Sequence, residues 1–169
     1  MNFMDPENFT IEQKKEFQMW PDASIPSVSI MPYIKRIRKD AIRVFIVGDV
    51  RGESTFDILE SVRKVELITV LNSSSELTEL FDKNTEKHKD RISTKVLESP
   101  VDCVIVCDNI CTPENLETAY EACLSGGIFC GNGHETQKVK TSLNTFRRKV
   151  KIGIPISISN RTTWFWIKR

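Results

Sequence analysis

Four short polar segments carry most of the side chains that could bind a ligand or move a proton. They span residues 48–54, 72–75, 108–111 and 131–135, and each follows a short apolar run. Each segment is rich in Gly, Asn, Asp, Ser or His. In an open parallel sheet, ligands bind beyond the carboxyl ends of the strands, near the point where the strand order switches. The spacing therefore predicts one polar cleft lined by these four segments.

The first polar segment is a turn that reads GDVRGES, with glycines at Gly48 and Gly52. Glycine at such a turn lets the backbone pass close to a ligand and bend sharply into the following helix. The pattern is not the G-x-G-x-x-G fingerprint of pyrophosphate-binding Rossmann domains. Taken alone, this glycine spacing is weak evidence for a ligand site and favours a purely structural turn.

Alternating strands and helices must position these segments. Strands are predicted at residues 44–47, 67–71, 92–97, 103–107, 128–130, 152–158 and 163–167. Helices are predicted from Ser54 as an N-cap, around Leu80, from Pro113 to Cys123 with Gly126 and Gly127 as the stop, and over residues 139–150. Strands that alternate with helices indicate a parallel sheet, and the two adjacent strands at the end must pair antiparallel. The expected fold is α/β, a three-layer sandwich with a Rossmann-like, doubly wound, mainly parallel sheet and a C-terminal antiparallel hairpin.

The first 40 residues differ from this regular pattern. A helix is expected between Thr10 and Met19, and prolines then break any long helix. Tyr33, Ile34 and Ile37 form a short amphipathic turn that can lie against a core. We expect residues 1–40 to be a lead-in segment that covers one edge of a single domain formed by residues 41–169.

Several ordered motifs resemble class I S-adenosylmethionine (SAM)-dependent methyltransferases. The turn from Gly48 to Ser54 after a buried strand is similar to the first motif of small bacterial and phage members, whose turn reads close to G-x-x-R-G-E-S. Residues 124–129 resemble the L-K-P-G-G helix end and fifth strand of the family, and residues 133–135 its G-H-D. Residues 162–168 are similar to its closing strand. The resemblance covers about residues 33–169.

The resemblance implies a SAM site above the first turn. The cofactor would lie over residues 48–54, with the ribose near the end of the second strand and the adenine or sulfonium beyond the fourth. The residues implied in cofactor binding are Gly48, Asp49, Gly52, Ser54, Asn72, Asp108 and Asn109. Two family positions that usually hold acids carry Ile46 and Asn72 here. Losing a charge-assisted bond to a ribose hydroxyl weakens binding roughly tenfold.

Asp108, His134 and Glu135 are the candidate catalytic and metal-binding side chains. Carboxylate oxygens and an imidazole nitrogen suit a hard or borderline divalent ion, which in metal-dependent methyltransferases orients a hydroxyl and lowers its pKa. Asp108 or His134 could also act as the base that takes the acceptor proton. The structural alternative is that Asp108 caps the following helix and His134 bonds a loop carbonyl.

The leading functional hypothesis is a methyltransferase acting on a small-molecule, sugar or protein acceptor. The alternative is a methyltransferase-like domain that has lost catalysis and serves as a binding or structural module. Ile46, Asn72 and the lack of an insertion that could form an acceptor lid favour this alternative. A nicotinamide-dependent oxidoreductase shares such a sheet, but the G-x-G-x-x-G turn and the acid after the second strand are missing.

Composition limits the partners and the compartment. Lys and Arg number 24 against 23 Asp and Glu, so no charge excess demands nucleic acid. The basic runs at residues 35–39 and 147–149, and His88, are expected on solvated helix surfaces. No apolar run reaches the roughly 18 residues of a membrane helix. Five cysteines without C-x-x-C spacing indicate a reducing, cytoplasmic setting.

Trp164 and Trp166 alternate with Phe165 on the last predicted strand, so the two indoles share one face. They could stack on a base or pack against a helix, and packing is the commoner role. If they are exposed, they offer a surface for a homodimer.

Overall fold

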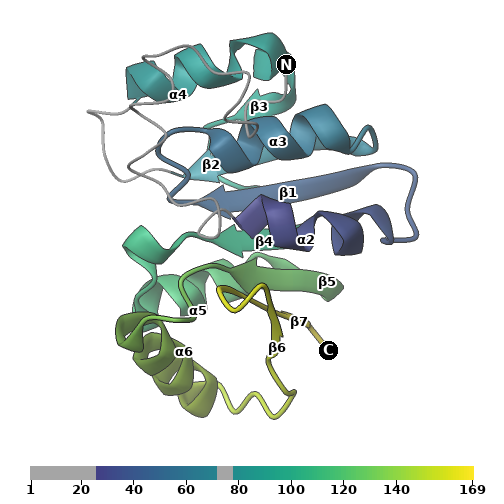
Figure 1. Cartoon of the computed structure of the whole chain (residues 1–169). Helices are drawn as coiled ribbons and strands as arrows, with labels where there is room; N and C mark the ends of the chain where they lie inside the picture. The colour runs from purple at the N-terminus through teal and green to yellow at the C-terminus, as the bar shows by residue number, and fades with distance from the viewer. Residues whose placement is uncertain (1–25, 72–77) are drawn as a thin grey trace.

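The computed structural model describes residues 26–71 and 78–169, whose centre is one seven-stranded sheet (Figure 1). The strand order is β3-β2-β1-β4-β5-β7-β6. The parallel strands are β1 (Ile42–Val47), β2 (Val65–Leu71), β3 (Ile92–Ser93), β4 (Val101–Val106) and β5 (Cys123–Gly131). Strand β7 (Thr163–Ile167) lies antiparallel to both β5 and β6 (Ser157–Ser159). The predicted mainly parallel sheet with a C-terminal antiparallel hairpin is confirmed.

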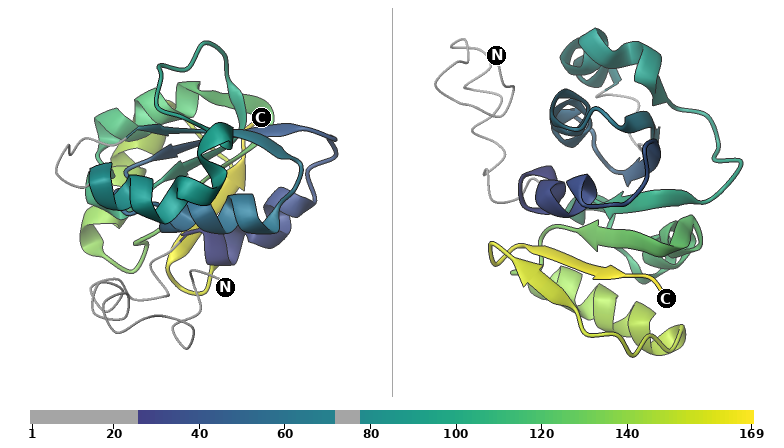
Figure 2. Two further views of the ribbon diagram at one scale, coloured as in Figure 1. Left: turned by 90° about the horizontal axis from the view of Figure 1, so that it is seen from above. Right: turned by 90° about the vertical axis from the view of Figure 1, so that its right-hand side faces the viewer.

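Helices cover both faces of the sheet, which gives three layers (Figure 2). One layer holds α2 (Pro26–Lys35), α3 (Glu53–Ser61), α4 (Thr78–Thr85) and the 3₁₀ helix η3 (Glu86–Arg91). The other holds α5 (Pro113–Glu121) and α6 (Gln137–Lys149), with the 3₁₀ turn η4 (Asp108–Ile110) leading into α5. Among the described residues no helix has the length and apolarity needed to cross a membrane.

The two cores follow from the alternation of side chains along the strands. In β1, Val44 and Ile46 join the apolar cluster under α2 and α3, while Phe45 and Val47 join the cluster under α5 and α6. A central parallel strand buried on both faces has to be apolar at every inward position, which explains the continuous run VFIV. All five cysteines of the chain are free and buried.

The aromatic closing strand is part of a core. Trp164 is 0% exposed and Trp166 is 2% exposed, and both rings contact Phe129. Phe165 faces the other core, so the predicted alternation is confirmed. Because the indoles are covered, they provide neither a base-stacking platform nor the exposed dimer surface considered from the sequence.

The largest differences from the predicted boundaries are at three strands. Strand β3 has only two residues, β6 begins at Ser157, and β5 begins at Cys123, where a helix was predicted. Strand β5 runs through both glycines because its neighbours pair with it there. The N–H of Gly126 donates to the carbonyl of Lys168 at 2.6 Å, and that of Lys168 donates to Gly127 at 2.9 Å. Backbone pairing with β7 thus replaces the predicted helix stop.

Helix α2 makes up most of the described part of the lead-in segment, which is residues 26–40. Ile30 and Ile34 are fully buried against the sheet, and the ring of Tyr33 lies 4.5 Å from that of Phe165. Pro32 lies inside this helix, so the expected break is not a complete stop. The helix predicted between Thr10 and Met19 lies outside the described residues.

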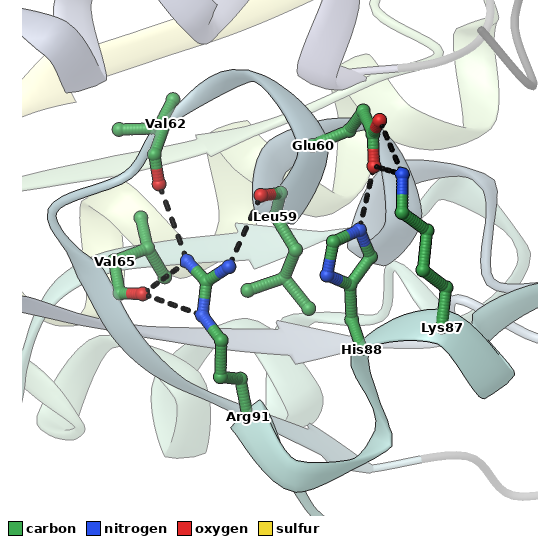
Figure 3. A network of polar contacts seen from close by, with 7 residues as sticks. All are labelled: Leu59, Glu60, Val62, Val65, Lys87, His88 and Arg91. Carbon is green, nitrogen blue, oxygen red and sulfur yellow. Dashed lines mark hydrogen bonds and ion pairs between the residues drawn. The ribbon is translucent and has the colours of Figure 1, made fainter. Parts of the chain in front are cut away.

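His88 is not the solvated residue that was predicted. Its side chain is 12% exposed, and its Nε2 lies 2.7 Å from the carboxylate of Glu60 on α3 (Figure 3). Its ring also lies 5.6 Å from that of Phe56. Lys87 contacts the same carboxylate at 2.7 Å. These contacts lower the pKa of Glu60 and fasten η3 to α3.

Arg91 closes the C-terminal end of α3. Its guanidinium donates to the carbonyls of Leu59 at 3.2 Å, Val62 at 3.4 Å and Val65 at 2.5 Å (Figure 3). The last carbonyls of a helix have no partner within the helix, and a cation there also complements the helix dipole. One side chain thereby links the end of α3 to the beginning of β2.

Candidate functional site

The candidate site lies where the strand order switches. Strands β2 and β3 extend the sheet on one side of β1, and β4 begins the extension on the other side. Ligands of doubly wound sheets bind beyond the carboxyl ends of the strands at such a point. The segments found there are residues 48–52 after β1, η4 after β4 and residues 132–134 after β5. Asn72, the predicted ribose contact, lies outside the described residues.

Gly48 is the point at which two of these loops meet. Its φ is 87°, a backbone conformation that residues other than glycine rarely adopt. Its N–H donates to the carbonyl of Leu71 at 2.8 Å. A Cβ added at Gly48 would lie 2.7 Å from Oδ1 of Asn109 and 2.8 Å from Cγ1 of Ile110. The turn after β1 and the turn after β4 therefore touch, and only glycine fits between them.

Asp49 is committed to the start of α3. Its Oδ2 accepts bonds from the backbone N–H of Thr55 at 2.8 Å and from the Thr55 hydroxyl at 2.6 Å. The side chain is buried, and burial raises its pKa while the bonds from Thr55 act in the opposite direction. An acid at a helix N-terminus satisfies backbone donors that have no other partner. The carboxylate thus holds the turn in shape.

Gly52, not Ser54, is the N-cap of α3. Its φ is 81°, and a Cβ there would lie 2.6 Å from Cγ2 of Thr85 at the end of α4. The side-chain amide of Asn84 donates to the carbonyl of Arg51 at 2.8 Å. Ser54 is buried within the first turn of the helix, which corrects its predicted capping role. Helix α4 therefore packs directly on the glycine turn.

Asn132 is a site residue that the sequence reasoning missed. Its side-chain oxygen accepts the backbone N–H of Asp108 at 2.8 Å, and the residue is almost fully buried. A Cβ at Gly133 would lie 2.7 Å from the Cβ of Asp108, so this loop also approaches η4 closely. One sequence feature could have identified Asn132: it is an amide directly after an apolar strand and directly before Gly133, whose φ is positive.

His134 and Glu135 do not join Asp108 in a metal site. Across residues 26–71 and 78–169, no three His, Cys, Asp or Glu side chains are grouped as metal ligands. The backbone N–H of His134 donates to the carbonyl of Thr162 at 2.9 Å, and Glu135 is exposed. The helix after η4 is capped by Thr112, so Asp108 is not its cap either.

The electrostatics of the cleft depend on a few groups. Partial burial lowers the pKa of His134, and Lys140 lowers it further, which favours the neutral imidazole. Burial raises the pKa of the Cys107 thiol, with Asp49 and Asp108 adding to the effect. Ile46 is fully buried in the core below Gly48, at the position where the resemblance implies an acid. At the switch point, Asn109 is exposed and Asp108 and His134 are partly exposed, so these polar groups are accessible to a ligand.

The chain is similar to known proteins in its fold, not in its sequence. No family model and no curated protein sequence matches the chain. The O-methyltransferase TomG from Streptomyces achromogenes, in complex with SAM, is 12% identical at a TM-score of 0.64, covering 92% of this chain and 86% of that one. An O-methyltransferase from Bacillus cereus, in complex with SAH, is 12% identical at a TM-score of 0.61, covering 98% of this chain and 84% of that one.

A spermidine synthase from Thermotoga maritima is similar as well, at 15% identity and a TM-score of 0.55. The alignment covers 77% of this chain but only 54% of the synthase. Likeness at such low identity is evidence about the fold alone. The chain has the Rossmann-like fold of SAM-dependent methyltransferases.

Proposed function

We propose that this chain is a SAM-dependent methyltransferase whose cofactor lies at the switch point between β1 and β4. The observation that carries the proposal is the meeting of Gly48 and Asn109 at that point, in a sheet of the methyltransferase type. A glycine turn of positive φ exposes backbone groups to a ligand, and the neighbouring turn supplies polar side chains.

The residues around the switch point divide into contacts and supports. Gly48 and Gly52 shape the turn, Asp108 and Asn109 belong to the neighbouring turn η4 and would contact the cofactor, and Asn72 would meet the ribose. Asp49 and Ser54 are buried in the start of α3, so we assign them to holding the turn. When bound, SAM supplies the methyl group. The chain's own task is to position the acceptor in line with it, which is where most catalysis of this kind arises.

A proton must leave the acceptor during transfer. Asp108 and His134 are the candidate bases, from the loops after β4 and β5. The lowered pKa of His134 keeps its imidazole neutral near physiological pH, and a neutral imidazole can accept a proton. The acceptor we propose is a small molecule, a sugar or a protein side chain. Within residues 26–71 and 78–169, Asp108, His134 and Glu135 are not grouped as metal ligands, so the proposal contains no metal-dependent step.

Calorimetric titration with S-adenosylhomocysteine tests the proposal. We expect binding in the micromolar range, weakened about 3- to 10-fold in Asn109→Ala, because one hydrogen-bonding group is lost. Asn144→Ala on the exposed surface of α6 is the matched control and should bind as the wild type does. Asn72→Asp should strengthen binding about tenfold if residue 72 meets the ribose.

A titration that shows no binding would decide against the proposal. No heat at near-millimolar ligand from a folded sample, in both the wild type and Asn72→Asp, would contradict the proposal. The chain would then be a methyltransferase-like module without a cofactor, which is the alternative considered from the sequence.

A further inference from the structure

A pocket lies at the edge of the sheet opposite the candidate site, where the parallel strands begin. Its volume is about 400 Å³, within the range of small-molecule sites. The lining comes from the end of α2, the start of β5 and the end of β7. The residues are Tyr33, residues 36–39, Asp102, residues 124–128 and Ile167. None of them belongs to the cofactor cleft, so the pocket is independent of the proposed function.

The side chains that line this pocket carry a net positive charge. Lys39 and Asp102 form an ion pair at 2.5 Å, and Asp102 also accepts the backbone N–H of Arg43 at 3.0 Å. The only carboxylate in the lining is thereby neutralised. Arg36 and Arg38 are exposed, and within the described part of the chain neither has a side-chain hydrogen bond or ion pair. Two guanidinium groups thus remain to receive an anion.

The segment carrying these arginines is held in place. The N–H of Arg36 donates to the carbonyl of Tyr33 at 3.1 Å, and that of Lys39 donates to Ile37 at 2.9 Å. The ammonium of Lys64 donates to the carbonyl of Lys35 at 2.8 Å and also to that of Ile37. A fixed backbone reduces the ordering cost of binding, and guanidinium groups match phosphate or carboxylate geometry.

The rest of the lining is apolar. Ile167 is 45% exposed, which is unusual for a large apolar side chain beside a core, and Ile128 and Ile37 lie along the same pocket. Tyr33 is fixed against Phe165, with 4.5 Å between the ring centroids. This wall can pack against an apolar body, whereas the arginines at the rim favour a charged group.

We propose that this pocket binds a small organic anion, namely a phosphate, sulfonate or carboxylate group attached to an apolar or aromatic body. The anionic group lies at Arg36 and Arg38, and the body packs on Ile37, Ile128 and Ile167. The basic run at residues 35–39 is therefore a ligand site, whereas the sequence favoured a solvated helix end.

Titration of the full chain followed by ¹⁵N–¹H NMR tests this site. Phenyl phosphate carries both features, inorganic phosphate carries only the charge, and phenol carries only the ring. We expect phenyl phosphate to shift the amide signals of Gly126 and Gly127 along a saturating curve, with the signals of Gly48 and Gly52 unchanged. Phosphate and phenol should each bind at least about tenfold more weakly, because each lacks one of the two contacts.

Charge-reversal variants test whether the two arginines bind the anion. The double variant Arg36→Glu, Arg38→Glu should weaken phenyl phosphate at least about tenfold, and both positions are exposed, so folding should be unaffected. Arg148→Glu, an exposed change of the same charge type on α6, should leave the affinity unchanged. AMP and hexyl phosphate then separate a nucleotide source from an aliphatic one. Three results would overturn the proposal. They are equal affinity for phosphate and phenyl phosphate, an equal loss of phenyl phosphate affinity in the double variant and in Arg148→Glu, and no saturation by about 10 mM phenyl phosphate.

Discussion

The side-chain oxygen of Asn132 accepts the backbone N–H of Asp108 at 2.8 Å, which joins the end of β5 to the end of β4 beside the cleft. The carbonyl of Asn132 accepts the indole N–H of Trp164 at 3.3 Å. One buried residue therefore ties together three strand ends, and the position of η4 depends on it.

Asn132→Ala should destabilise the protein by about 1–3 kcal/mol, because the part-buried N–H of Asp108 loses its acceptor. If η4 shapes the cofactor cleft, affinity for S-adenosylhomocysteine should fall as well. Urea unfolding and calorimetric titration measure the two effects. Asn144→Ala on the exposed surface of α6 is the control. Unchanged stability in Asn132→Ala would show that the hydrogen bond between Asn132 and Asp108 does not stabilise the fold.

Gly131→Ala should be among the most damaging single changes in the chain. The added Cβ would lie 2.3 Å from the carbonyl oxygen of Val106 and 2.4 Å from Cζ2 of Trp164. Neither a paired strand nor a fully buried indole can yield without cost, so we expect a loss of about 3 kcal/mol or more. Thermal unfolding measures it. Gly153→Ala, where a Cβ meets nothing within 4 Å, should be neutral, and a similar loss in both would contradict the prediction.

The buried carboxyl of Asp49 should make stability depend on pH in an unusual direction. Burial raises its pKa in the folded state, so the contribution to stability is greatest below the unfolded pKa and decreases as pH rises through the folded one. The wild type should therefore lose stability relative to Asp49→Asn as the pH rises above about 4, the unfolded pKa of an aspartate. Urea unfolding of both proteins checks the sign. A difference that grows in favour of Asp with pH would refute the assignment.

Arg91→Ala should lower the free energy of unfolding by about 1.5–3 kcal/mol. The guanidinium donates to two backbone carbonyls at the end of α3 and to that of Val65 at the beginning of β2, and hydrogen bonds from charged donors are the stronger kind. Lys89→Ala removes an exposed ion pair with Glu86, which solvent screens, and should change the free energy of unfolding far less than Arg91→Ala does. Comparable losses in the two variants would mean that Arg91 acts only as a surface charge.

The arrangement of the sheet was predictable from the sequence because it depends on local patterns. The run VFIV in β1 requires burial on both faces, and the short connection to the last strand requires an antiparallel pair. The glycine turn was found because glycine marks positions of positive φ, and both Gly48 and Gly52 have it.

The errors concern contacts between distant segments. His88 looked like a solvated residue within a charged stretch, but Glu60 lies 28 positions earlier in the chain and only the fold brings it near. Asn132 depends on Asp108 in the same way. The helix end near Gly126 was wrong because pairing with Lys168 outweighs the local preference of two glycines. Such partners are set by tertiary structure, which no local pattern contains.

The two outer strands of the sheet have a consequence for association. Among the described residues, β3 has two residues and β6 has three, so the outermost strands of the sheet are very short. Unpaired N–H and C=O groups along a long edge act as a template for another chain, and short edges offer few of them. Edge-to-edge growth into fibrils or precipitates is therefore disfavoured by the way the sheet is terminated, even though the strands at its centre are strongly apolar.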